Sequence, residues 1–78
     1  MQLNIISPTE TLYSGEIYLV KVPGTSGSFE VLKNHASIIS SLEKGKIKVI
    51  STKGEETFFD IESGYIEVNN NKVSILVN

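Results

Sequence analysis

The sequence predicts an all-β protein whose short, mainly antiparallel strands form a two-sheet β-sandwich, or flattened barrel. Short apolar runs recur at intervals of roughly eight to twelve residues, separated by glycine, proline or asparagine, as is typical of sandwiches and barrels. Only one segment has helical spacing, and it is short and rich in β-branched residues and serine. With 78 residues, the chain is expected to form a single domain, 1–78.

The first half of the chain contains three predicted strands. The first is Gln2–Ile6, and it stops near Pro8, which cannot donate a hydrogen bond to a strand ladder. The second is Glu16–Val22, which is expected to stop at Pro23-Gly24 for the same reason. A short third strand follows at Ser28–Leu32.

The segment Ala36–Glu43 carries the weak helical signal. Ile38, Ile39 and Leu42 have a spacing that fits one helical turn. Because β-branched residues and serines favour extended or turn structure, we expect a loop or a strand here instead.

The second half of the chain contains the remaining predicted strands, at Lys46–Ser51, Thr57–Ile61, Tyr65–Val68 and Lys72–Val77. Alternation places Ile47 and Val49 on one face of the first of these, and Phe59 with Ile61 on one face of the next. The triplet Asn69-Asn70-Asn71 tolerates left-handed backbone, so it suits a hairpin turn between the last two strands.

Some apolar residues fall outside the inward-facing phase of these strands and are candidates for the outer surface. They are Tyr18, Leu19, Phe58 and Tyr65. Scattered surface apolar residues are normal in globular proteins. If the four cluster, they instead indicate a face that binds a partner. The sequence leaves both readings open.

The composition excludes several classes of site. The chain has no cysteine, so disulfides and thiolate metal sites are excluded and a reducing compartment is favoured. Its basic residues are all lysines and its net charge is −2, which lowers the expectation of nucleic-acid binding. No segment reads as a signal peptide, and the apolar runs are too short to span a membrane.

The glycine-containing stretch Gly24-Thr25-Ser26-Gly27 does not meet the requirements of a phosphate-binding loop. Such a loop needs a lysine directly after its last glycine and a following helix. Here a predicted strand follows, and Glu30 would repel an anion. We therefore expect the glycines to supply positive φ in tight turns.

The remaining polar clusters are weak signals of catalysis or binding. His35 is the only histidine, and no serine and acid stand at a spacing that indicates a hydrolytic site. Glu55 and Glu56 are adjacent on an extended chain and therefore point to opposite faces. A mild basic patch is formed by Lys44, Lys46, Lys48 and Lys53. No aromatic residues are interleaved with these lysines, so the patch is best interpreted as a solvated strand face.

Motifs spread along the whole chain resemble one known family. They are Tyr13-Ser14-Gly15-Glu16, Val22-Pro23-Gly24-Thr25, Asn34-His35-Ala36, and Ser63-Gly64-Tyr65-Ile66-Glu67-Val68, with Gly27, Phe29, Leu42, Gly45, Ile47 and Val49 between them. Together and in this order, they resemble the epsilon subunit of F-type ATP synthase. Each motif is weak alone, but the match covers nearly the whole chain.

The resemblance implies a β-sandwich at the foot of the central stalk of the synthase, with no catalytic role and no cofactor. Such a domain binds the gamma subunit and rests on the polar loops of the membrane c-ring. It couples ring rotation, driven by protons or sodium ions, to ATP synthesis. The implied location is the cytoplasmic face of the bacterial inner membrane, as a peripheral part of the complex with no transmembrane segment and no nucleic-acid partner.

The resemblance also implies which residues face each partner. The residues implied to face the c-ring are Ser28, Phe29, Glu30, Lys33, Asn34 and His35. The residues implied to face gamma are Ser7, Tyr18, Leu19, His35 and Ser40. This chain departs from the family pattern in the ring-facing region. Ser28 stands where many relatives are acidic, Glu30 where glycine is usual, and Lys33 and Ser37 where prolines are usual.

Typical members of the family continue into a C-terminal domain of two helices, which can inhibit ATP hydrolysis. This sequence reaches Asn78, about where the sandwich is expected to end, and it does not contain that helical pattern.

Two other functions stay open at this level. One is a free-standing small barrel or sandwich that binds a peptide, a carbohydrate or single-stranded nucleic acid, which would need a concave aromatic or basic groove. The other is an enzyme, which would need a convergent polar pocket around His35.

Overall fold

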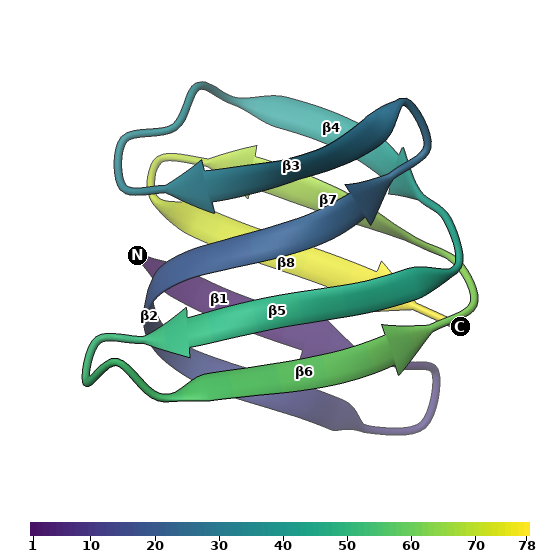
Figure 1. The fold of residues 1–78 in the computed structure, drawn as a ribbon, viewed down its shortest axis with the longest axis horizontal. Helices are drawn as coiled ribbons and strands as arrows, with labels where there is room; N and C mark the ends of the chain where they lie inside the picture. The colour runs from purple at the N-terminus through teal and green to yellow at the C-terminus, as the bar shows by residue number, and fades with distance from the viewer.

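A computed structural model describes all residues of the chain, Met1–Asn78, and every regular element in it is a strand (Figure 1). The strands are β1 Gln2–Ile6, β2 Thr11–Gly24, β3 Gly27–Leu32, β4 Ile38–Leu42, β5 Gly45–Ser51, β6 Glu56–Ile61, β7 Gly64–Asn69 and β8 Lys72–Val77. Two of the predicted strands have these same bounds, and the others differ at one or both ends. The all-β prediction is confirmed.

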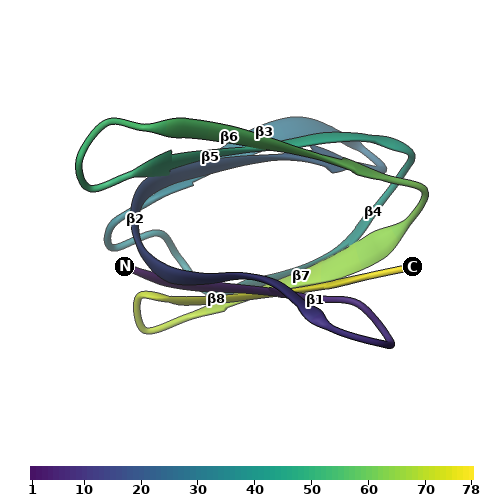
Figure 2. The ribbon, with the colours of Figure 1, turned by 90° about the horizontal axis from the view of Figure 1, so that it is seen from below.

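The strands form two stacked layers (Figure 2). Hydrogen bonding follows the order β1-β8-β7-β4-β2-β5-β6, with β3 paired to β2 and β1 also paired to β2. All the pairings are antiparallel except that of β1 with β8. One layer therefore contains β1, β8, β7 and β4, and the other contains β3, β5 and β6. The predicted sandwich of mainly antiparallel strands is confirmed.

Strand β2 belongs to both layers and bends between them (Figure 2). Its first part, from Thr11 to Glu16, pairs with β1, while the part from Ile17 to Gly24 pairs with β3 and β5. The predicted strand Glu16–Val22 did not include most of this first part, which forms a hairpin with β1. The predicted stop at Pro23 was also wrong. Pro23 lies near the strand end, where its carbonyl accepts a hydrogen bond from the Glu43 amide at 2.9 Å.

The register of β2 against β5 shifts between Ile17 and Leu19. Leu19 lies two residues before Lys21 on the same face, and its registered neighbours are Leu32 and Ile50. Although it is on the outer face, only 8% of Leu19 is exposed. The prediction that Leu19 contributes outer surface is therefore wrong, because its side chain is almost fully covered even though it lies on the outer face.

The segment whose structure the sequence left open forms strand β4, Ile38–Leu42, and every one of its residues pairs with β7. Its apolar spacing follows the alternation of a strand, because Ile38 and Leu42 face inward and Ile39 faces outward. The helical spacing was therefore coincidental.

The core lies between the two layers and is wholly apolar. It contains Ile47, Val49 and Ile61 as predicted, and no polar or charged residue is buried. Phe59 is half-buried, packs against this core, and meets the Tyr13 ring edge to face at a centroid distance of 6.1 Å. Tyr18, Phe58 and Tyr65 are exposed as predicted.

The turns use left-handed backbone at asparagine as well as at glycine. In the β7–β8 hairpin, Asn70 has φ 50° and Asn71 has φ 61°, which confirms the predicted turn. Gly27 has φ 125°, as expected for a turn glycine, but Gly24 does not have positive φ. A Cβ at Gly24 would lie only 2.7 Å from the Gly27 carbonyl oxygen, so close packing requires that glycine.

Candidate functional site

The six residues implied to face the ring do not form one loop. Ser28 lies at the start of β3, whereas Lys33 to His35 follow its end, roughly 15–20 Å along the strand. Between them, Phe29 is registered with core residue Val22 and packs inward. Glu30 is exposed and registered with Lys21. Strand alternation therefore divides the set into an inward residue, an outer strand face and a separate loop.

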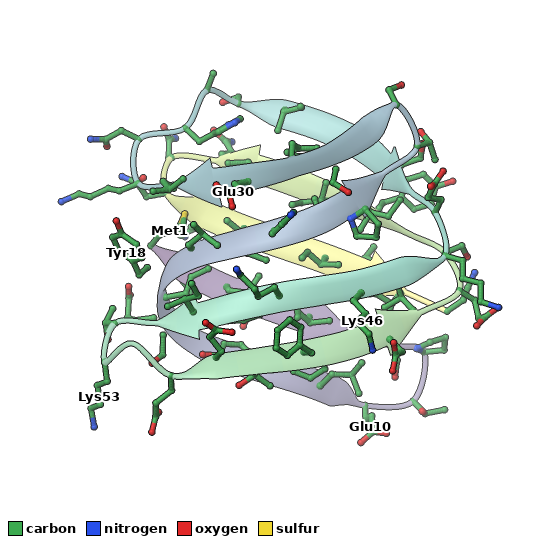
Figure 3. All side chains as sticks on the ribbon, viewed as in Figure 1. Met1, Glu10, Tyr18, Glu30, Lys46 and Lys53 are labelled. Carbon is green, nitrogen blue, oxygen red and sulfur yellow. The ribbon has the colours of Figure 1, made fainter.

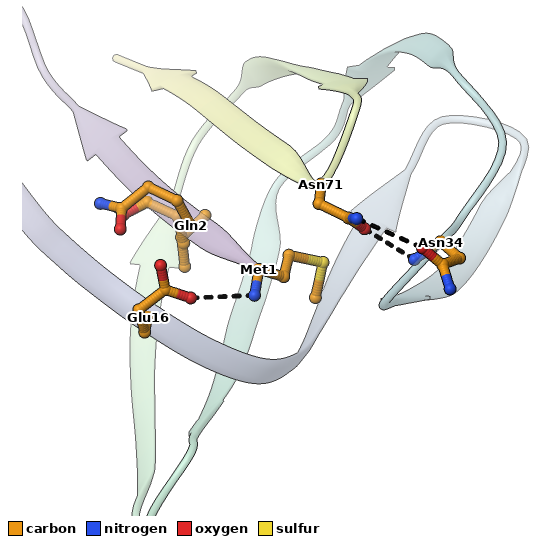
Figure 4. A network of polar contacts seen from close by, with 6 residues as sticks. Met1, Gln2, Glu16, Asn34 and Asn71 are labelled. Carbon is orange, nitrogen blue, oxygen red and sulfur yellow. Dashed lines mark hydrogen bonds and ion pairs between the residues drawn. The ribbon is translucent and has the colours of Figure 1, made fainter.

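The loop after β3 is held in a defined conformation. The His35 amide donates to the Leu32 carbonyl at 3.1 Å, which closes a β-turn in which Asn34 has φ 66°. The Asn34 amide donates to Oδ1 of Asn71 at 2.7 Å, and Nδ2 of Asn71 donates to Oδ1 of Asn34 at 3.2 Å (Figure 4). The His35 ring is half-buried, with Nδ1 2.7 Å from the Ala36 carbonyl.

A shallow groove of about 380 Å³ brings together residues from the two implied sets. It is lined by Met1, Ile17, Tyr18, Leu32, Lys33 and Thr52. Tyr18 was implied to face gamma and Lys33 to face the ring. Figure 3 shows Tyr18 and Met1 at one end of the molecule and Glu10 at the other. We call the loop Lys33–Ser37, together with Tyr18, the polar end.

The amino group of Met1 also lies at this end, 2.9 Å from a carboxylate oxygen of Glu16 (Figure 4). The Met1 carbonyl accepts a hydrogen bond from the Ile17 amide at 2.8 Å. These contacts fix the first residue against the bend of β2, directly beside Tyr18.

Ser7 lies away from the polar end, in the β1–β2 turn. Its hydroxyl is 3.1 Å from the Glu10 carbonyl and 3.2 Å from the Glu10 amide, so the side chain stabilises its own turn. Ser40 is half-buried, on the inward-facing side of β4. Leu19 is buried. The five residues implied to face gamma therefore do not form one continuous surface.

A second surface lies on the outer face of the layer that contains β1, β8, β7 and β4. Ile6 is registered with Leu76, and Leu76 with Tyr65, so the three form a row across three strands. Ile39 lies beside this row on β4. All four are among the exposed large hydrophobic residues, and 62% of Tyr65 is exposed. We call these four residues the apolar face.

The apolar face borders a groove of about 480 Å³ whose lining includes Ser7 and Pro8. Of its four members, only Tyr65 was selected from the sequence. Ile6, Ile39 and Leu76 each directly follow an apolar residue whose side chain faces inward, as in the pair Ile5-Ile6. Adjacent apolar residues on a strand cannot both face the core, and that was the signal for the other three.

The structure offers little to support chemistry. It contains no group of three or more His, Asp or Glu side chains placed to hold a metal ion. No buried side-chain polar atom lacks a hydrogen-bond partner, and the one hydrogen bond of the His35 ring is with the neighbouring Ala36 carbonyl. The structure has no helix of the length and apolarity that a membrane crossing requires.

Comparison with known families decides the relationship. The family model described as "ATP synthase, Delta/Epsilon chain, beta-sandwich domain" matches residues 1–78. The chain belongs to this family. The resemblance seen in the sequence motifs is thus confirmed, and so is the two-sheet sandwich that it implied.

Individual relatives are similar over nearly the whole of this chain. The ATP synthase epsilon chain of Chlorobaculum tepidum is 39% identical over 95% of this chain and 84% of its own length. That of Campylobacter lari is 42% identical, over 97% of this chain and 58% of its own. That of Protochlamydia amoebophila is 36% identical, and this chain spans only 50% of it.

Solved structures share the fold at lower identity. A chain of the Euglena gracilis mitochondrial ATP synthase, in a structure of its OSCP, F1 and c-ring, superimposes with a TM-score of 0.90 at 21% identity. The match covers 96% of this chain and 48% of that one. A chain of the Tetrahymena thermophila mitochondrial ATP synthase, in a structure of the central stalk and c-ring, gives 0.82 at 15% identity, over 97% of this chain and 61% of that one.

Proposed function

We propose that this chain acts as the sandwich domain of an epsilon subunit, joining the gamma subunit to the c-ring in the central stalk of an ATP synthase. In this role it catalyses nothing and carries no cofactor. It transmits torque from ion-driven ring rotation to gamma, at the cytoplasmic face of a bacterial inner membrane. The observation that carries the proposal is the family match over all of residues 1–78.

The apolar face is our proposed site for gamma. Tyr65 and Leu76 are neighbours in adjacent strands and are both more than half exposed, so covering them removes apolar surface from water. Ser7 lies in the bordering groove and would form part of the polar rim of such an interface. Aromatic residues at the centre of an interface commonly provide much of its binding energy.

The polar end is our proposed site for the junction between gamma and the ring. Its loop presents Lys33 and Asn34 to solvent, with half-buried His35 beside them, and Tyr18 lies across the shared groove. Ser28 and Glu30 lie further along β3 on its outer face, where they would extend the ring contact. Leu19, which the resemblance implied to face gamma, is not part of our proposed interface because its side chain is buried.

The test is co-expression with the gamma subunit of the same genome, followed by titration calorimetry of the purified pair. We expect a one-to-one complex. Tyr65→Ser and Leu76→Ser should each weaken it about tenfold, which corresponds to about 1.4 kcal/mol. Phe58→Ser is the matched control, because Phe58 is a similarly exposed aromatic residue on the other layer.

The outcomes separate the proposal from its alternatives. Failure of two folded proteins to associate would contradict the proposed function and favour an independent binding module. A complex that is weakened by Phe58→Ser and is insensitive to the other two substitutions would move the gamma site to the opposite layer.

A further inference from the structure

A reciprocal pair of amide hydrogen bonds joins two turns that are distant in the sequence. Asn34, in the loop after β3, and Asn71, in the β7–β8 hairpin, exchange a backbone-to-side-chain bond of 2.7 Å and a side-chain bond of 3.2 Å (Figure 4). Both residues have left-handed backbone, with φ of 66° and 61°. The strands β3 and β4 hold the two ends of the loop, and these two bonds hold the loop itself against the β7–β8 hairpin.

The hairpin side of this pair is itself anchored. The Asn71 carbonyl accepts a hydrogen bond from the Gln2 amide at 3.0 Å, which connects the turn to the start of β1. A second, longer contact of 3.4 Å runs from the Ser37 hydroxyl to Oδ1 of Asn69. The loop is therefore held near both of its ends by the β7–β8 turn.

Asn70 provides an internal comparison. It lies next to Asn71 in the same turn and has nearly the same backbone conformation, with φ 50°. Its side chain is exposed and makes no hydrogen bond within the chain. Left-handed backbone alone explains an asparagine at this position, whereas Asn71 adds a contact that reaches the loop.

We propose that Asn71 is a positioning residue for subunit binding. It holds the loop Lys33–Ser37 in the conformation that is recognised at the junction of the gamma subunit and the c-ring. The inference rests on the proposed function, in which this loop meets the junction of gamma and the c-ring. A loop that is ordered before association loses less conformational freedom on binding. Asn71 thereby acts on affinity through Asn34 without needing to touch the partner.

The experiment compares Asn71→Gly with Asn70→Gly in the full chain. Glycine adopts left-handed backbone readily, so both substitutions keep the turn, but only the first removes the amide pair. We expect Asn71→Gly to shift the NMR resonances of the Asn34 and His35 amides and to speed hydrogen exchange at the Asn34 amide. Asn70→Gly should leave both unchanged. Thermal unfolding of both variants checks that the fold is intact.

The second readout is affinity for a rotor subcomplex of the gamma subunit and detergent-solubilised c-ring. We expect Asn71→Gly to bind between about threefold and tenfold more weakly, and Asn70→Gly to bind like the unsubstituted chain. Asn71→Asp keeps an oxygen that accepts a hydrogen bond from the Asn34 amide. Compared with Asn71→Gly, it should therefore bind more tightly and show slower hydrogen exchange at the Asn34 amide. Such rescue distinguishes positioning from a general loss of stability.

Three results would overturn the inference. They are unchanged loop resonances in Asn71→Gly, equal rotor affinity of Asn71→Gly and the unsubstituted chain, or an equal loss in both glycine variants. If the unsubstituted chain does not bind the subcomplex, the proposed function fails and the binding half of the inference fails with it. The exchange measurement still decides whether Asn71 orders the loop.

Discussion

The outer faces of the two layers both carry a leucine between apolar neighbours, yet the two leucines differ in exposure. Leu19, on the layer of β3, β5 and β6, lies between Leu32 and Ile50 and is 8% exposed. Leu76, on the opposite layer, lies between Ile6 and Tyr65 and is 54% exposed.

The comparison separates two roles that a strand pattern alone does not distinguish. Alternation reports which face a side chain is on, but it does not report how much of that side chain is covered. A covered outer residue contributes to folding stability, while an uncovered one is available to a partner. We therefore expect Leu19 to contribute to folding stability and Leu76 to belong to the proposed gamma interface.

The sharpest test of this difference is the same substitution at both leucines. Leu19→Ala should lower the free energy of unfolding by about 3 kcal/mol, because it removes a buried side chain. Leu76→Ala should lower it by less than about 1 kcal/mol, because most of its surface already meets water. Urea unfolding followed by circular dichroism measures both. Equal losses would mean that the exposure of the two residues has been misassigned.

A smaller difference is expected between the adjacent phenylalanines of β6. Phe59 is half-buried against the core and contacts Tyr13, whereas Phe58 faces solvent. We expect Phe59→Ala to cost about 2 kcal/mol, below the value for a fully buried ring, and Phe58→Ala to cost less than about 0.5 kcal/mol. Chemical denaturation checks both. A larger loss at Phe58 would show that the strand phase of β6 is inverted.

The sequence predicted most of the fold because the determining signals are local. Alternation located Ile47 and Val49 inside, and the asparagine triplet located a hairpin that needs left-handed backbone. The sequence did not predict that β2 crosses between the layers. That path depends on pairing with β1, β3 and β5, and pairing with distant strands leaves no local pattern.

The candidate site was less predictable for the same reason. The amide pair joins Asn34 to Asn71, and only the folded chain brings them together. The apolar face likewise depends on the register of three strands, which aligns Ile6, Leu76 and Tyr65. Residues that the resemblance implies to face the ring together, such as Ser28 and His35, lie at and beyond opposite ends of β3.

The smallest expected effect concerns the charged part of the outer face of β5 and β6. There Lys46 Nζ lies 2.8 Å from an Asp60 carboxylate oxygen, and both side chains are mostly exposed. Water and salt screen such pairs, so Asp60→Asn should change the free energy of unfolding by less than about 0.5 kcal/mol. Unfolding at low and high salt measures the change. A larger loss of unfolding free energy that salt does not change would mean that this ion pair contributes to stability, as the covered Leu19 side chain does. The outer faces of the two layers would then differ in charge pairing as well as in how well their aliphatic side chains are covered.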